Sequence, residues 1–586
     1  MHPALVRLGI GRQWRKFGAP FYLSRAAGAE KALKKQTVIA IALQLALAVA
    51  ACAQTRDAGL PHLERRGHAT QLIVDGKPFL ILGGEVHNSS SSSVDYMRPI
   101  WPRLAAMHLN TVVIPVAWET IEPEEGRFDF QVLDGLLQAA RANRLHLVLL
   151  WFGSWKNTYS SYAPAWVKQN EQRFPRVQMS DGRGTERLSP FSKAVCTADA
   201  TAFSRLMRHL HTIDGEQHTV LMVQVENEVG VIPESRDHSA AANEAFAGQV
   251  PAALTRYLSD RRSTLNPELR SVWESAGAKT SGTWQQVFGS APITDDLFMA
   301  WQYASSIQTV AAAGKAEYPL LMYANAALVR PNYQPGQYNS GGPLPHSIDI
   351  WKAAAPSLDL LSPDIYFNEF ALWASSYTRP DNPLFIPEAQ SGATGAANAM
   401  YAFGELSAIG FSPFGIDDEN NEPLDLVGIT VPGERPDSKA IASAYAELAN
   451  LSPMLLDAQR AGNVRAGLIE GEAQRAARVR IGDYTANIVR SAAQSSARIG
   501  VLFLQSGPDE FLVTGVGDAQ VSFTSDTPGP PIVGIESIDE EFFHDGHWTP
   551  GRRINGDESA HGQALHIHAG DLLAGCIYRV RLYRYH

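Results

Sequence analysis

The stretch Thr219–Gly230, TVLMVQVENEVG, decides how the fold is interpreted. Its largely apolar first part is typical of a strand that is buried on both faces, as in a parallel sheet covered by helices. The run then ends in Glu226, Asn227 and Glu228. Charged and amide side chains at the end of a buried strand predict that this end opens on a functional site.

Seven further apolar runs resemble this one, and longer amphipathic stretches separate them. The eight expected strands are 78–86, 111–118, 145–155, 219–228, 318–326, 358–366, 383–390 and 409–417. Eight buried strands that alternate with helices predict an α/β fold, a (β/α)8 barrel at 65–450. A doubly wound open sheet is the alternative, although no Gly-rich phosphate loop follows the first strand.

The regions on either side of the barrel alternate apolar and polar residues, as antiparallel strands do. Upstream, QLIVDGKPFLIL (71–82) predicts a hairpin that turns at Asp75 and Gly76 and caps the floor of the barrel. Downstream, alternating runs separated by Gly, Pro and Asp turns predict an antiparallel β-sandwich domain at 455–586, with 492–500 as a loop.

Residues 1–53 are interpreted as a signal or targeting segment. The basic run EKALKKQ (30–36) precedes an apolar run, Val38–Ala51, that is too short to span a bilayer. Cleavage before Cys52 would leave a lipid-anchored protein of the outer membrane, and cleavage after Ala53 would leave a soluble periplasmic or secreted one. Export to the periplasm is expected, and Cys52 is the lipid-anchor candidate.

Composition limits the partners. The chain has a formal net charge of -10, which argues against nucleic acid because phosphate backbones are bound mainly by basic patches. An oligosaccharide substrate is expected, a homodimer is left open, and membrane attachment is expected only through a lipidated Cys52. Neither a cofactor nor a metal is expected, because Cys196 and Cys576 lack metal-ligand spacing and two carboxylates suffice for the chemistry below.

The active site of a (β/α)8 barrel lies at the carboxyl ends of its strands, where this sequence places carboxylates, amides and aromatic rings. Aromatic rings stack on the apolar face of a pyranose, while carboxylates and amides pair with hydroxyl groups. The strand ends therefore predict a sugar site. Its expected substrate contacts are Glu85, Trp118, Glu119, Trp155, Asn157, Asn227, Tyr323, Asn325 and Tyr366, whereas His87 is interpreted as a hydrogen-bonded structural residue.

Two glutamates suggest a specific reaction. In the retaining scheme, Glu388 attacks the anomeric carbon as the nucleophile while Glu228 serves as the general acid and then the general base, at a carboxylate separation near 5 Å. Asn227 is expected to bind the 2-hydroxyl group, and Tyr366 to orient Glu388. Strict alternation would point Glu226 and Glu228 the same way, and the more C-terminal of the two is expected to reach the mouth.

These motifs resemble a known group of enzymes. VQVENEVG (223–230) and the lone Glu388 resemble clan A glycoside hydrolases, and PVAWETIEPEEGRFDF (115–130) is similar to family 35 β-galactosidases and their family 42 counterparts. The runs 534–558 and 578–586 resemble the β-domain of a bacterial branch of family 35. The resemblance implies a retaining exo-β-galactosidase with Glu228 as acid/base, Glu388 as nucleophile and galactosylated xyloglucan fragments as substrate.

The chain departs from the family 35 pattern at three places. Asn88 replaces a Tyr, Ser154 replaces a Glu, and Val229 replaces the Tyr after the Asn-Glu pair. Asn157, Glu85 or Glu119 are the candidates to compensate. The alternatives are another clan A exo-glycosidase, such as a β-glucosidase, β-mannosidase or α-L-arabinopyranosidase-like enzyme, and a noncatalytic glycan-binding protein.

Overall fold

The centre of the computed structural model is a parallel sheet of eight strands in the order β4-β13-β12-β11-β10-β9-β6-β5. Their bounds are β4 Ile81–Leu82, β5 Thr111–Ala117, β6 His146–Lys156, β9 Val220–Asn227, β10 Leu321–Ala327, β11 Leu360–Ile365, β12 Phe385–Ala389 and β13 Gly410–Pro413. The chain just after β4 meets β5 through a parallel bridge between Glu85 and Val113. The N–H of Val113 donates to the Gly84 carbonyl at 2.9 Å. This closure confirms the predicted (β/α)8 barrel and excludes the open sheet.

The structure describes residues 59–586 apart from 330–331, 419–437, 492–496, 545, 569 and 571–574. The predicted targeting segment, with Cys52, lies outside the described residues, as does most of the predicted loop at 492–500. Within the described ranges, none of the helices has the length and apolar character needed to cross a membrane.

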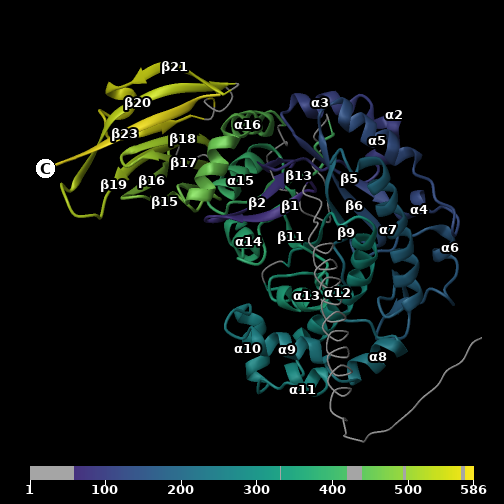
Figure 1. Cartoon of the computed structure of the whole chain (residues 1–586). Helices are drawn as coiled ribbons and strands as arrows, with labels where there is room; N and C mark the ends of the chain where they lie inside the picture. Colours follow the sequence, from purple (N-terminus) through teal and green to yellow (C-terminus); the bar gives the residue numbers. More distant parts are fainter. Residues whose placement is uncertain are drawn as a thin grey trace, which may run out of the picture. The chain divides into compact units, whose positions relative to one another are not determined.

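Helices surround the strands of the barrel (Figure 1). The main ones are α3 Ile100–Ala106, α5 Gln131–Ala142, α7 Lys193–Asp214, α12 Pro292–Glu317, α13 Ile348–Ala354, α14 Phe370–Tyr377, α15 Gly392–Gly404 and α16 Ser438–Ala461. Helix α5 shows why they pack there, since its buried residues Leu133, Leu136, Leu137 and Ala140 recur at helical spacing and form one apolar stripe.

The upstream hairpin closes the floor of the barrel, as predicted. Strands β2 Ala69–Val74 and β3 Lys77–Phe79 pair in antiparallel fashion around Asp75 and Gly76, whose φ angles of 49° and 74° are those of a tight hairpin turn. Leu72 and Val74 pack in one cluster with the barrel-strand residues Ile81, Leu221 and Leu321.

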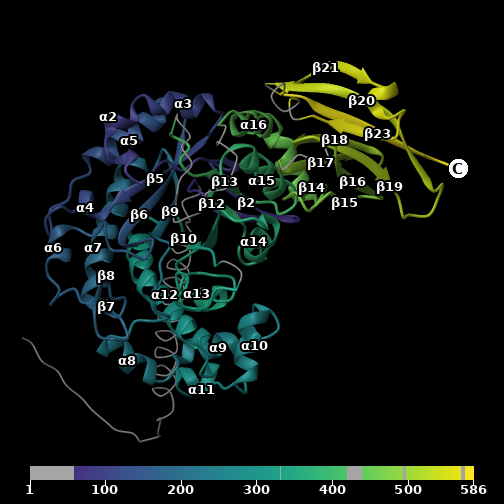
Figure 2. The same cartoon turned by 180° about the vertical axis from the view of Figure 1, so that it is seen from behind.

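Between β9 and α12 the chain adds α8 Ala240–Ala247, α9 Ala252–Asp260, α10 Pro267–Ser275 and α11 Trp284–Phe288. Figure 2 shows α9, α10 and α11 together beside α13, with α8 apart from them on the side of β7. Because the group follows the carboxyl end of β9, it belongs to the face of the barrel on which a substrate would enter.

The C-terminal region consists of antiparallel sheets, which confirms the predicted class of this domain. One sheet has the order β14-β17-β18-β23-β20-β21 and the other β15-β16-β19-β22. Their bounds are β14 Val464–Ile469, β15 Ala476–Ile481, β16 Tyr484–Arg490, β17 Ile499–Gly507, β18 Glu510–Val516, β19 Ala519–Thr524, β20 Ile532–His544, β21 His547–Ile554, β22 Leu565–Ile567 and β23 Ile577–Tyr585. Residues of both sheets, such as Ile488 and Val501, share one apolar core.

Glu447 on α16 makes the stability of the protein depend on pH. Its side chain is buried, one carboxylate oxygen has no partner among the described residues, and burial raises the pKa of Glu447 to about 7. The pKa of this side chain is lower in the unfolded chain, near 4.5. Its contribution to the free energy of unfolding is therefore fully present below about pH 4.5 and is lost as the pH rises through 7, which lowers that free energy by up to about 3 kcal/mol.

We therefore expect Glu447→Gln to raise the melting temperature at pH 8 but to leave it nearly unchanged at pH 5. Asp457→Asn, at an exposed position of the same helix, is the matched control and should shift neither value. Equal shifts of the melting temperature of Glu447→Gln at both pH values would show that the charge of Glu447 does not destabilise the protein.

Candidate active site

Three buried carboxylates meet at the carboxyl ends of neighbouring strands. Glu228 follows β9, Asp364 lies in β11 and Glu388 in β12, and one oxygen of each lies within 4.8 Å of the other two. The separation of Glu228 and Glu388 is close to the roughly 5 Å at which one carboxylate can attack a sugar carbon while the other protonates the leaving oxygen.

Backbone geometry decides which of the two glutamates on β9 reaches this cluster. Glu226 and Glu228 have φ angles of 65° and 46°, so the chain is not extended there and strict alternation does not apply. Glu226 instead accepts hydrogen bonds from the N–H groups of Ser154 and Trp155 at 3.0 and 2.7 Å. The expectation that both glutamates face the same way is wrong, and only Glu228 joins Glu388.

The surroundings of Glu228 suit a general acid. Asn157 Nδ2 donates to Glu228 Oε2 at 2.7 Å, and the Glu228 N–H donates to Asn325 Oδ1 at 2.9 Å. Burial, and then the charge of Glu388, raise the pKa of Glu228 to about 7, while the Lys156 ammonium lowers it. A carboxyl group that is still partly protonated near neutral pH can donate a proton to a departing oxygen.

Glu388 is held by the residue predicted to orient it. The Tyr366 hydroxyl donates to Glu388 Oε1, and Glu388 Oε2 has no partner among the described residues. Burial, followed by the Glu388 charge, raises the pKa of Tyr366 well above its usual value, so the phenol stays protonated and keeps donating. One oxygen of Glu388 is thus fixed while the other is available for a substrate.

Two residues of this cluster escaped the sequence reasoning. Asp364 accepts from Asn325 Nδ2 at 2.6 Å, and burial together with the Glu388 charge raises its pKa well above the usual value. Lys156, the last residue of β6, is buried and acts electrostatically on both Glu228 and Glu85. Strand alternation could have revealed Asp364. It lies two residues before Tyr366 and two after Ser362, so the three side chains share one face of the strand.

Several buried polar groups around the carboxylates lack partners. Both amide atoms of Asn227, the Tyr323 hydroxyl and Glu85 Oε1 make no hydrogen bond to the described part of the chain. Burial, and then the Glu388 charge, raise the pKa of Glu85 well above its usual value. Buried polar atoms are nearly always hydrogen-bonded, so these groups offer donors and acceptors to a bound molecule.

Comparisons with known proteins agree with this geometry. The family model of glycoside hydrolase family 42, described as β-galactosidase, matches residues 94–395, which is 302 of 586 residues and includes Glu228, Tyr366 and Glu388. The chain belongs to glycoside hydrolase family 42. A second model, a domain of unknown function (DUF5597), matches residues 441–566. The prediction of clan A is confirmed, and the matched family is 42 rather than family 35 specifically.

Individual relatives match only part of this family 42 chain. It is 29% identical over 218 residues to a β-galactosidase of Xanthomonas manihotis, covering 36% of this chain and 33% of the relative. It is 22% identical over 271 residues to β-galactosidase GalA of Bacillus licheniformis, covering 44% and 36%. The chain thus spans about a third of the length of these relatives.

Among solved structures, a β-galactosidase from Bacillus circulans sp. alkalophilus is similar, with 14% identity, a TM-score of 0.43 and coverage of 65% of this chain and 57% of that one. The barrel fold of this family 42 protein is shown by its own strand order.

Four predicted sugar contacts of the family 42 barrel serve other purposes. Trp118 and Trp155 are wholly buried, and their indole N–H groups donate to Glu122 at 2.9 Å and to the Leu188 carbonyl at 3.0 Å. Glu119 is partly exposed and pairs with Lys168 at 3.1 Å. Asn325 Oδ1 accepts from the Glu228 N–H, and Asn325 Nδ2 donates to Asp364. A strand end also supplies side chains to the surrounding helix layer, as Trp118 and Trp155 do, and Asn325 positions the carboxylates. The sugar contacts of these four residues stay predictions.

His87 is held within the protein, in keeping with its structural interpretation. Its Nδ1 lies 2.9 Å from Asp417 Oδ1, and the Ser90 hydroxyl donates to Asp417 Oδ2 at 2.5 Å. The hydrogen bond to Asp417 raises the pKa of His87. This contact ties the ends of the first and last barrel strands together.

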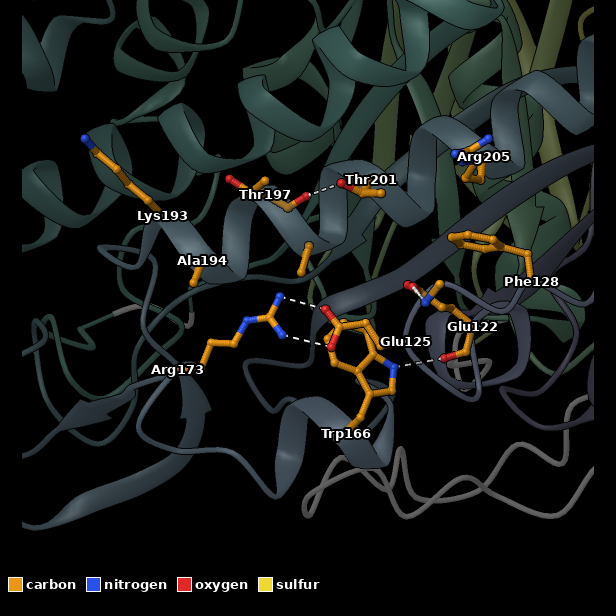
Figure 3. A pocket seen from close by; sticks show the side chains of 12 residues that line it. Glu122, Glu125, Phe128, Trp166, Arg173, Lys193, Ala194, Thr197, Thr201 and Arg205 are labelled. Atoms are coloured by element: carbon orange, nitrogen blue, oxygen red, sulfur yellow. Dashed lines mark hydrogen bonds and ion pairs between the residues drawn. The ribbon is translucent and has the colours of Figure 1, made fainter.

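A separate hollow of about 490 Å³ lies beside α7, lined by Phe128, Trp166 and Arg173 among others (Figure 3). Two of its charged groups pair with each other, since Arg173 binds Glu125 at 2.7 Å, and a third, Glu122, accepts a hydrogen bond from Trp118. The hollow contains none of the three clustered carboxylates and is not the reaction site.

Within the described ranges, Glu228, Asp364 and Glu388 also form a group of carboxylates that could hold a metal ion. A cation there would require deprotonated ligands and would neutralise the charges of Glu228 and Glu388. Cation binding and glycoside cleavage are therefore competing uses of these three side chains.

The Glu228 pKa gives a prediction for this family 42 site. If Glu228 is the general acid, it must be protonated to act, so kcat/KM should fall as the pH rises through about 7. Since the Lys156 charge lowers the pKa of Glu228, Lys156→Met should move this alkaline limb to higher pH. Lys193→Met, in the hollow beside α7, is the control and should leave the pH of the alkaline limb unchanged. A limb that moves to lower pH in Lys156→Met would contradict the prediction.

Proposed function

We propose that the protein is a retaining exo-β-galactosidase that releases terminal β-D-galactose from oligosaccharides. The observation that carries the proposal is the pair Glu228 and Glu388, which lies within 4.8 Å at the strand ends of a family 42 barrel. The names of the matched relatives, all β-galactosidases, support the choice of galactose.

The geometry supports a double displacement. Glu388 Oε2, which has no partner in the described structure, attacks the anomeric carbon, and the Glu228 carboxyl gives its proton to the departing oxygen. The aglycone leaves with that proton, and a galactosyl ester of Glu388 remains. Glu228, now a carboxylate, takes a proton from water, whose oxygen attacks the same carbon and releases galactose and the Glu388 carboxylate. Asn227 would bind the 2-hydroxyl group.

The natural substrate and the location of the enzyme are further parts of the proposal. Galactosylated xyloglucan fragments follow from the resemblance of 534–558 and 578–586 to a bacterial branch of family 35. Export to the periplasm, with or without lipidation of Cys52, follows from the N-terminal sequence. A homodimer is left open.

The proposal is tested by measuring initial rates of the purified protein on β-galactoside, β-glucoside, β-mannoside and α-L-arabinopyranoside nitrophenyl substrates. The β-galactoside should be cleaved fastest. A faster rate on another sugar would overturn the sugar assignment while leaving the carboxylate mechanism in place. Calorimetric binding of galactose without hydrolysis of any substrate would instead favour the glycan-binding alternative.

A further inference from the structure

The turn that carries Tyr366 is not held by the barrel alone. After β11 the chain passes through Tyr366 to Glu369, whose φ of 61° marks a sharp turn, and then enters α14. The first N–H groups of a helix need acceptors, and Glu369 at the N-cap makes no capping hydrogen bond through its side chain. The acceptor comes from a distant part of the chain.

That acceptor is Glu470, the residue directly after β14. Its two carboxylate oxygens accept from the N–H groups of Phe370 and Ala371, the first two residues of α14, at 2.5 and 3.0 Å. A carboxylate at a helix N-terminus is also favoured by the helix dipole. The C-terminal domain thus supplies the cap that fixes where α14 begins.

Arg498, just before β17, holds the same turn from a second side. Its guanidinium is buried, donates to Asn368 Oδ1 at 3.4 Å and to Asn398 Oδ1 of α15 at 2.7 Å, and lies 4.0 Å from Glu470. The ion pair therefore joins the turn after β11 to the helix that follows β12, the strand of Glu388.

The interface around this pair is closely packed. A Cβ atom built on Gly500 of β17 would lie 2.4 Å from the Ala397 carbonyl oxygen of α15, and one built on Gly404 of α15 would lie 2.7 Å from the Ala466 Cβ of β14. Such close approach leaves little freedom for α15 to shift against β14 and β17.

We propose that the C-terminal domain is part of the catalytic apparatus, because Glu470 and Arg498 position the turn that carries Tyr366 and thereby the hydrogen bond from Tyr366 to Glu388. This inference rests on the proposed role of Glu388. It assigns a task to the domain matched as one of unknown function, since residues 441–566 include both Glu470 and Arg498. Both are positioning residues and touch no reacting atom.

The test compares Glu470→Ala with a matched control, Glu405→Ala. Glu405 Oε2 accepts from the Ala466 N–H at 3.2 Å, so it is also a carboxylate-to-backbone contact across this interface, but it lies at the other end of α15. Glu470→Ala should lower kcat roughly ten- to a hundredfold with a smaller change in KM, as expected when a reacting group is misplaced. Glu405→Ala should stay within about twofold of the parent at a comparable melting temperature.

Two further measurements separate positioning from general destabilisation. Glu470→Gln retains one acceptor oxygen and should recover part of the lost kcat. Combining Glu470→Ala with Tyr366→Phe should lower kcat no further than Tyr366→Phe alone, because both act through one hydrogen bond. Fully additive losses, or equal losses of kcat in Glu470→Ala and Glu405→Ala, would overturn the inference.

Hydrogen exchange distinguishes failure of this inference from failure of the proposed function. In Glu470→Ala, and not in Glu405→Ala, amides of residues 366–377 should exchange faster whether or not the protein cleaves any glycoside. Unchanged exchange in that segment would overturn the positioning role. Faster exchange in a protein that is inactive on every substrate would contradict the proposed function alone.

Discussion

Replacing Glu388 with alanine is expected to lower kcat on a nitrophenyl β-galactoside by on the order of 10⁴-fold or more, as removal of a catalytic nucleophile does. Glu388 has one oxygen without a partner in the described structure, and its carboxylate lies within 4.8 Å of Glu228. The neighbouring carboxyl of Asp364 has a raised pKa and is a poor substitute. The measurement is the initial rate with and without added azide, which can occupy the space that the side chain leaves.

The stereochemistry of the azide product makes this prediction specific. With Glu388 absent, a single displacement by azide must invert the anomeric centre and yield the α-galactosyl azide. Glu125→Ala, which removes a surface partner of Arg173, is the control and should keep nearly full activity. A Glu388→Ala enzyme that keeps more than a small fraction of the parent rate would show that another group is the nucleophile.

Replacing Glu228 with alanine should have a large effect that depends on the leaving group. General acid catalysis contributes about 10² to 10⁴-fold, and its loss matters most when the departing oxygen is basic. For an alkyl β-galactoside we therefore expect a loss of about that size in kcat/KM, and for a dinitrophenyl β-galactoside a much smaller one.

Azide should accelerate the Glu228→Ala variant by a different route. The galactosyl ester of Glu388 still forms, so azide attacks it in a second displacement and yields the β-galactosyl azide. Equal losses on both leaving groups, or the α-azide from this variant, would contradict the assignment of Glu228 as acid/base.

The barrel and its central pair of carboxylates could be predicted because both follow from local patterns. Each buried strand is a continuous apolar run, and the carboxyl ends of parallel strands must meet, so Glu228 and Glu388 come together although 160 residues separate them. The contact between Tyr366 and Glu388 follows from the same geometry. These features require only the strand order and the positions of the strand ends.

Other features depend on tertiary detail that local patterns do not contain. The positive φ angles of Glu226 and Glu228 turn one side chain out of the mouth and the other into it. Trp118 and Trp155 lie at strand ends but pack within the apolar core. Glu470 contacts α14 across a sequence separation of 100 residues, and no periodicity indicates which loop a distant carboxylate caps.

In the proposed mechanism, Glu388 becomes covalently linked to the sugar. The most direct test is to incubate the protein with a 2-deoxy-2-fluoro-β-galactosyl fluoride, which forms the glycosyl-enzyme quickly and releases it slowly, and to locate the added mass in a digest. We predict one fluorogalactosyl group per chain, on Glu388. A label on Glu228, Asp364 or Glu85, or an unlabelled protein that still hydrolyses β-galactosides, would contradict it.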